Sequence, residues 1–257
     1  MSPRTPPDVI GFFGGTKAEC GRLIAGRLAG GKQTTIVTPN PIMIERAVRD
    51  RKFRAVLNDA TIRLADGVGI VLAARLAGTS LTRIPGIEMA ETLLACAARY
   101  GYRVYLLGGK PGVAKEAAAR LRTRLPGLCI CGVRDGYFSA AEAERVTADI
   151  AAAHPDFLFV CLGSPKQENW IAENQSRLPG VRLFMALGGS LDVWSGRLER
   201  APALLRAAGL EWLWRMAHEP RRLRELPLIV AFSGRTLAFC SARIVKLHRT
   251  GKKIFPS

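Results

Sequence analysis

The sequence predicts a doubly wound α/β fold, in which a mostly parallel sheet is flanked by helices and followed by a basic amphipathic helical appendage. Short apolar runs of strand length alternate along the chain with amphipathic stretches of helix length. The runs are apolar almost without interruption, which is typical of parallel strands covered on both faces. The chain has 257 residues, of which 48% are hydrophobic, and this is enough to build a large core.

The expected strands and helices alternate in order along the chain. Buried strands are expected at residues 34–39, 103–109, 156–163 and 182–189, and a strand followed by a turn at 128–138. Helices are expected after the first strand through Arg54, at 112–125 and at 139–154. The last of these begins with a capping-box pattern, Ser139 followed three residues later by Glu142.

Basic charge collects in the last quarter of the chain. The net charge is +17, and between Arg197 and Ser257 there are 13 Lys and Arg against 4 Asp and Glu. Such a segment favours a polyanion, namely nucleic acid, acidic lipid or a phosphorylated substrate, although a solvated basic face without a partner is the alternative. We therefore divide the chain into a catalytic domain at residues 1–200 and a helical appendage at 201–257.

The appendage ends in an apolar segment with interspersed basic residues, at 226–249. Its apolar run is too short to span a bilayer and is broken by the sequence Ser-Gly-Arg at 233–235. A basic amphipathic helix lying in the membrane surface fits this pattern, and a helix packed on the core is the alternative. The N-terminal residues contain no apolar signal-peptide core, so secretion is not expected.

Several other classes of protein are disfavoured by missing signatures. The six cysteines are scattered and lie mostly in apolar stretches, which predicts buried thiols in a reducing cytoplasm. The three histidines are isolated, so no metal site is expected. The aromatic residues cluster with apolar runs and form no nucleic-acid-binding motif.

Two glycine-rich stretches fail as nucleotide motifs. Residues 26–33, GRLAGGKQ, carry Gln33 where a P-loop needs Ser or Thr, and they follow a helix instead of a strand. Residues 108–112, GGKPG, are no dinucleotide fingerprint, which disfavours a nicotinamide-dependent oxidoreductase. The second stretch nevertheless places backbone amides and a helix start at a strand end, where a phosphate can bind, and a simple tight turn is the alternative.

Polar side chains follow four of the expected strand ends. They are Thr38 and Asn40, Asp66, Lys166 with Gln167 and Glu168, and Asp192 with Arg200. Because the carboxyl ends of parallel strands meet at one edge of a sheet, these loops together predict a pocket. Asp66, in the stretch LADGVGIV at 64–71, has two interpretations: a cap of the next helix or a carboxylate held for chemistry.

The motifs in combination resemble the WecG/TagA/CpsF family of bacterial glycosyltransferases over roughly residues 34–225. The matching stretches are TPN at 38–40, ADGVGIVLAARLAG at 65–78, YLLGGKPGV at 105–113, DGYF at 135–138, GSPKQENWI at 163–171, LGGSLDVWSGRLERAP at 187–202 and GLEWLWRMAHEPRRLRE at 209–225. One departure is Glu88-Met89, where the family more often has Asp-Leu, and it bears on sugar preference.

The resemblance implies an enzyme that moves a sugar from a UDP donor to a sugar on polyprenyl diphosphate, with inversion and without metal or other cofactor. The sugars transferred in the family are N-acetylmannosamine, its uronic acid and glucose, for teichoic acid, enterobacterial common antigen or exopolysaccharide. The enzyme would lie peripherally on the cytoplasmic face of the inner membrane. No nucleic-acid partner is expected, and a homo-oligomer is left open.

The resemblance also implies roles for individual residues. Asp66 matches the proposed base, which the helix start at Gly67 is expected to keep ionised, and Thr38 and Asn40 match residues near the transferred sugar. For the donor we expect the amides of Gly108 and Gly109 together with Lys166 and Gln167 at the diphosphate, and Tyr137 and Asp192 at the nucleoside. For the acceptor diphosphate we expect Arg215, Arg221 and Arg224, whose guanidinium forks suit phosphate oxygens.

Overall fold

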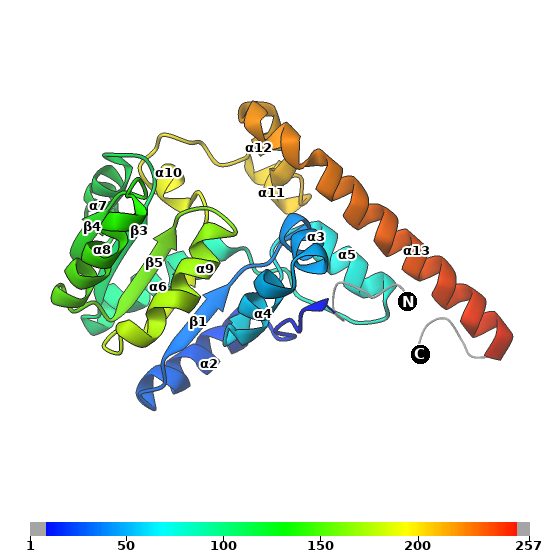
Figure 1. Ribbon diagram of the computed structural model, residues 1–257, viewed down its shortest axis with the longest axis horizontal. Coiled ribbons are helices and arrows are strands. Elements are labelled where there is room, and N and C mark those ends of the chain that lie inside the picture. The colour runs from blue at the N-terminus through cyan, green and yellow to red at the C-terminus, as the bar shows by residue number, and fades with distance from the viewer. Residues whose placement is uncertain (1–8, 251–257) are drawn as a thin grey trace.

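The computed structural model describes residues 9–250, with side chains for all of these except 220, 221 and 243–250 (Figure 1). Six parallel strands form one sheet in the order β2-β1-β6-β5-β3-β4. The strands are β1 (Thr34–Val37), β2 (Ile62–Arg63), β3 (Arg103–Gly108), β4 (Cys129–Arg134), β5 (Phe157–Cys161) and β6 (Leu183–Ala186). The predicted parallel α/β fold is confirmed, and β2 is a short strand that the sequence did not separate from the segment before Asp66.

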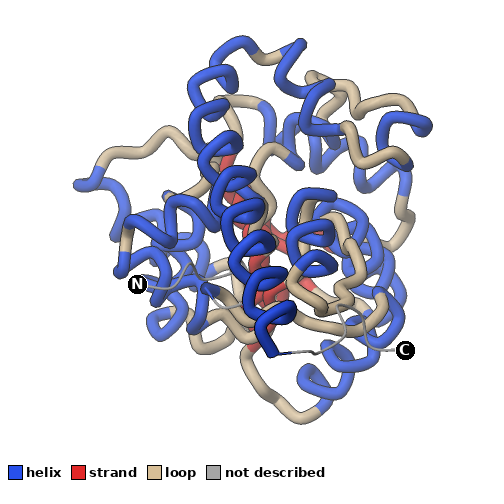
Figure 2. Tube along the Cα trace, turned by 90° about the vertical axis from the view of Figure 1, so that its right-hand side faces the viewer, coloured by secondary structure: helices blue, strands red, loops and turns tan. Residues whose placement is uncertain are grey.

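Helices cover both faces of the sheet (Figure 2). One face carries α2 (Lys17–Ala29), α6 (Gly86–Tyr100), α7 (Val113–Arg124) and α10 (Ser190–Trp194). The other carries α3 (Pro41–Arg49), α4 (Arg51–Asp59), α5 (Val68–Leu76), α8 (Ala140–Ala152), α9 (Lys166–Asn174) and α13 (Leu226–Thr250). Successive residues of β5 alternate between the two cores, so every residue of β5 is buried, as its continuous apolar run predicts.

The helix ends follow local sequence signals. The capping box at Ser139 is confirmed: its Oγ accepts from the Glu142 amide at 3.3 Å, and its own amide donates to Glu142 Oε2 at 2.8 Å. The helical segment after β1 is two helices, because Asp50 ends α3 and caps α4 by accepting from the amides of Lys52 and Phe53. All six cysteines are free, but Cys129 is exposed, contrary to the expectation of burial.

The C-terminal part consists of α11 (Ala203–Ala207), α12 (Glu211–His218), the 3₁₀ helix η2 (Pro220–Glu225) and α13; a shorter 3₁₀ helix, η1 (Gln175–Arg177), follows α9. α13 packs against α3 and α5, with Phe232 and Thr236 buried. Farther along, it extends past α5 (Figure 1). The expected helix is therefore present, and its first half packs on the core. None of the helices in the described range is long and apolar enough to cross a membrane.

The strand order places a topological switch point between β3 and β5. The connection from β3 leads outward to β4 on one side, and the connection from β5 leads to β6 on the other. In open α/β sheets ligands bind in the crevice beyond the carboxyl ends of the strands at such a point. The loops after β3 and β5 are those that contain the GGKPG and SPKQE stretches.

Candidate active site

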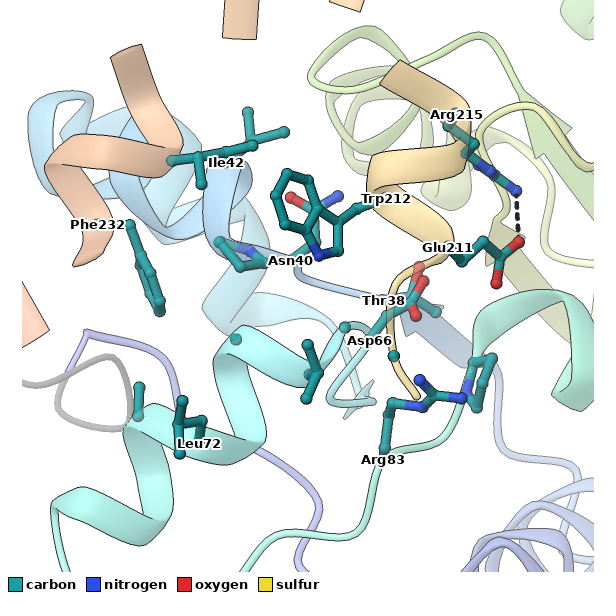
Figure 3. A pocket seen from close by; sticks show the side chains of 18 of the residues that line it. Thr38, Asn40, Ile42, Asp66, Leu72, Arg83, Glu211, Trp212, Arg215 and Phe232 are labelled. Carbon is teal, nitrogen blue, oxygen red and sulfur yellow. Dashed lines mark hydrogen bonds and ion pairs between the residues drawn. The ribbon is translucent and has the colours of Figure 1, made fainter. Parts of the chain in front are cut away.

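A cavity of about 460 Å³ lies beyond the carboxyl ends of β1 and β2, enclosed by α5, α12, η2 and α13 (Figure 3). Thr38 and Asn40 enter it from the loop after β1, and Asp66 from the loop after β2. Arg83 comes from the loop before α6, and Arg215 from α12. The catalytic candidates predicted from sequence therefore share one cavity.

Asp66 is positioned by the backbone on both sides. Its amide donates to the carbonyl of Pro39 at 3.3 Å, which ties the loop after β2 to the loop after β1. The N-cap of α5 is Gly67, with φ of 97°, and no side chain caps this helix end. Asp66 is therefore not the helix cap, and of the two interpretations that the sequence left open, the structure favours a carboxylate held for chemistry.

Burial raises the pKa of Asp66 to about 6. The charges of Arg215 and Arg83 lower this pKa, and the charge of Glu211 raises it. The pKa is therefore higher than the helix start alone suggested, because desolvation outweighs the arginines, yet the expected ionised form still holds at neutral pH. Figure 3 shows Asp66 and Thr38 lying between Arg83 and Glu211. A carboxylate with a pKa near 6 is ionised at neutral pH and still basic enough to accept a proton.

Asn40 caps a helix and also lines the cavity. Its Oδ1 accepts from the amide of Met43 at 3.0 Å, and so caps α3. This bond fixes the rotamer of the side chain and leaves its amide group at the cavity. Thr38 packs closely against Gly86, where an added Cβ would lie 2.8 Å from Thr38 Cγ2.

The expected arginines differ in position. Arg215 lines the cavity and pairs with Glu211 at 3.3 Å, whereas Arg224 is exposed and outside the cavity lining. The side chain of Arg221 lies outside the described residues. Arg222, which sequence reasoning missed, lines the cavity and pairs with Glu219 at 3.0 Å. Arg83 was also missed, because it follows no expected strand end.

A second group of candidates lies at the switch point, next to the cavity. The amide of Gly109 donates to the carbonyl of Cys161 at 3.1 Å, so it is engaged in joining the loops after β3 and β5. Lys166 Nζ donates to the carbonyl of Gly136 at 3.2 Å. Tyr137 is 66% exposed, and its backbone amide donates to Asp135 Oδ1 at 2.9 Å. These groups belong to the segments after β3, β4 and β5, at the carboxyl edge of the sheet.

Gln167 connects the switch point with the loop after β6, and Asp192 lies on α10, which follows that loop. Gln167 is buried; its Nε2 donates to Glu168 Oε1 at 2.7 Å and its Oε1 accepts from the amide of Gly188 at 2.9 Å. Gln167 thus holds two loops together. Asp192, on α10, is half-buried, and burial followed by the charge of Glu219 raises its pKa. Among residues 9–250 no group of three metal-binding side chains is found.

The parallel sheet, its switch point and the adjoining cavity, which contains the raised-pKa carboxylate Asp66, are the arrangement of an α/β enzyme whose active site lies at the carboxyl edge of the sheet. The family model for the glycosyl transferase WecG/TagA/CpsF family matches residues 10–242, and the chain belongs to this family. The chain is 36% identical over 223 residues to an N-acetylglucosaminyldiphosphoundecaprenol N-acetyl-beta-D-mannosaminyltransferase of Bacillus spizizenii, which covers 86% of this chain and 85% of the relative. The resemblance seen in the motifs is confirmed.

Proposed function

We propose that this glycosyltransferase moves N-acetylmannosamine, or else its uronic acid or glucose, from UDP to a sugar on polyprenyl diphosphate, with inversion, in cell-surface polysaccharide synthesis. The name of the relative from Bacillus spizizenii favours N-acetylmannosamine as the first donor sugar to test and an N-acetylglucosaminyl diphosphate lipid as the acceptor. The observation that carries the proposal is the raised pKa of Asp66 in a cavity that it shares with Arg83 and Arg215.

In the proposed reaction, Asp66 takes the proton of the acceptor hydroxyl as that oxygen attacks the anomeric carbon of the donor sugar. The new bond joins the acceptor oxygen to this carbon, and the bond from the carbon to the UDP oxygen breaks on the opposite face. Thr38 and the amide of Asn40 orient the sugar beside Asp66, since both line the same cavity. UDP leaves with the bonding electron pair.

The negative charge that develops on UDP needs compensation by the protein. Lys166 and the glycine turn at Gly108 lie at the switch point, where the strand order favours nucleotide binding. Gln167 contributes by holding the turn at Gly188 next to the switch point, through the hydrogen bond that its Oε1 accepts from the Gly188 amide. We assign the nucleoside to the same edge of the sheet, near Tyr137 in the segment after β4 and Asp192 on α10.

The appendage at 201–257 is proposed to hold the acceptor. Arg215 and Arg222 line the cavity from α12 and η2, and Arg221 and Arg224 belong to the same segment. Guanidinium groups bind diphosphate oxygens in a bidentate manner. The basic surplus of this segment would attract the anionic cytoplasmic leaflet, where a lipid-linked acceptor lies.

Release of UDP tests the proposal directly. The full chain is incubated with UDP-N-acetylmannosamine, its uronic acid counterpart or UDP-glucose, with and without N-acetylglucosaminyl diphospho-undecaprenol. We expect release to depend on the acceptor, and Arg215→Met to raise the KM for the acceptor at least about tenfold with little change in the KM for the donor. The matched control is Arg99→Met, at an exposed position outside the cavity. Release that is independent of acceptor with every donor would contradict the proposal.

A further inference from the structure

The cavity has an apolar extension that the proposed chemistry does not use. α5 contributes Val68, Leu72 and Leu76, which are one turn apart on one helix face and 37%, 55% and 43% exposed. α13 contributes Phe232 and Leu237 on the opposite side. We call the space lined by these five side chains the apolar arm. Figure 3 shows Leu72 and Phe232 on one side of the cavity, away from Arg83 and Arg215.

The exposure of the apolar arm is unusual for large apolar side chains that line one concave surface. Scattered exposed leucines are ordinary, whereas a contiguous exposed apolar surface marks a place where something binds. The two helices meet at Gly69, where an added Cβ would lie 2.9 Å from Pro41 Cγ and 3.7 Å from Phe232. Beyond this close approach the side chains of Leu72 and Leu237 remain exposed, so the helices do not fill the arm themselves.

The apolar arm is continuous with the polar end of the cavity. Asp66 lies two residues before the start of α5, and the apolar arm leads away from it from Val68 to Leu76, a length of roughly 12 Å along the helix axis. Arg215 and Arg222 line the same cavity. One cavity thus offers a base, cationic groups and an apolar channel, which are complementary to a sugar, a diphosphate and a hydrocarbon chain.

We propose that the apolar arm binds the first isoprene units of the acceptor's lipid, roughly two of them, so that this part of the chain is held by α5 and α13 instead of the bilayer. This inference rests on the proposed function and adds a lipid-binding site to it. The enzyme would then recognise the hydrocarbon next to the diphosphate directly, and membrane attachment alone would not account for its preference for lipid-linked acceptors.

The test uses water-soluble prenyl diphosphates without sugar, donor or membrane. Dimethylallyl, geranyl and farnesyl diphosphate carry one, two and three isoprene units, and their affinities for the full chain are measured by calorimetry. We expect the Kd to fall about tenfold or more from the first to the second, because additional apolar surface is buried, and to change little with the third. Equal affinities for all three would overturn the proposal.

Two variants locate the effect. Leu72→Ser and Leu76→Ser are expected to weaken geranyl diphosphate binding about fivefold or more while leaving dimethylallyl diphosphate nearly unaffected. The control is Leu23→Ser on α2, which is 43% exposed like Leu76 but lies outside the cavity. Because all three leucines are partly exposed, these substitutions should leave the fold intact, which circular dichroism checks.

Other occupants of the apolar arm give different results. If Leu72→Ser weakened binding to phosphatidylglycerol vesicles but not to geranyl diphosphate, the arm would be a bilayer-contacting surface, and the proposal would be wrong. If the substitution converted a dimer into a monomer in sedimentation experiments and left the affinity for prenyl diphosphates unchanged, a second copy of the chain would be the occupant and the proposal would be wrong. Transfer from UDP-sugars without chain-length dependence would defeat this inference alone, and chain-length dependence without transfer would defeat the proposed function alone.

Discussion

Replacing Asp66 with asparagine should abolish transfer and, above pH 6, stabilise the fold. Burial holds the pKa of Asp66 at about 6, whereas its ordinary value is 3.8. The folded protein therefore binds this proton more tightly than the unfolded chain, so the contribution of Asp66 to the free energy of unfolding falls as pH rises from about 4 through 6. About two pKa units correspond to about 3 kcal/mol, an upper limit because the side chain keeps some contact with water.

Urea unfolding of the wild type and of Asp66→Asn at pH 8, 6 and 4.5 measures this difference. We expect the variant to be more stable by about 1–3 kcal/mol at pH 8 and the difference to shrink towards zero at pH 4.5. UDP release should fall about 10²- to 10⁴-fold. The control is Asp59→Asn, an exposed carboxylate at the end of α4.

Two results would refute the reasoning on Asp66. A stability difference that does not change with pH would show that the carboxylate is not desolvated in the folded protein. Turnover close to that of the wild type would remove Asp66 from the role of base and leave it, at most, in orienting the acceptor.

The remaining predictions concern pH, backbone and packing. kcat/KM should fall about tenfold per pH unit below about 6 as the base is protonated, which initial rates across pH 5–8 would show; a flat profile would contradict it. Gly108→Ala should prevent soluble expression, because the added Cβ would lie 2.2 Å from a carbonyl oxygen of β5 at φ of 130°; a folded variant would show that β3 and β5 can separate. Arg235→Met should cost about 1–3 kcal/mol in urea unfolding and expose α13 to protease, because it leaves the fully buried Glu45 carboxylate with one partner fewer; unchanged proteolysis would argue that packing alone docks the helix. Gln167→Ala should lower UDP-sugar affinity in calorimetry by freeing the loop at Gly188, with little change in acceptor KM; the opposite split would place Gln167 on the acceptor side.

Much of the fold could be predicted from sequence because its signals are local. β3, β5 and β6 are buried on both faces, and their apolar runs reflect this without any knowledge of the tertiary structure. The grouping of Thr38, Asn40 and Asp66 also followed, since loops at the ends of parallel strands meet at one edge. The break between α3 and α4 was missed. The apolar pattern continues across Asp50, so the pattern alone does not show that Asp50 ends one helix and caps the next.

The electrostatics of the site could not be predicted from sequence. The pKa of Asp66 depends on burial and on charges contributed by the loop before α6 and by α12, which are far apart along the chain. The sequence suggested a helix dipole, whose influence is small compared with desolvation. Arg83 and Arg222 also escaped notice, because they are far apart along the chain and only the tertiary structure brings both to the lining of one cavity.

The strand order has a consequence for how the molecule acquires its structure. β3, β4 and β5 are consecutive in the chain, and β3 finds both of its neighbours among them. β1 can pair early with β2, but its other neighbour is β6, with Thr34 opposite Leu183, so β1 joins the centre of the sheet only after the last strand has closed a long loop. We expect the nucleotide side to form early in refolding and the carboxylate side late, which pulse-labelled hydrogen exchange would show as protection of β3 before β1. Simultaneous protection of both strands would contradict this order.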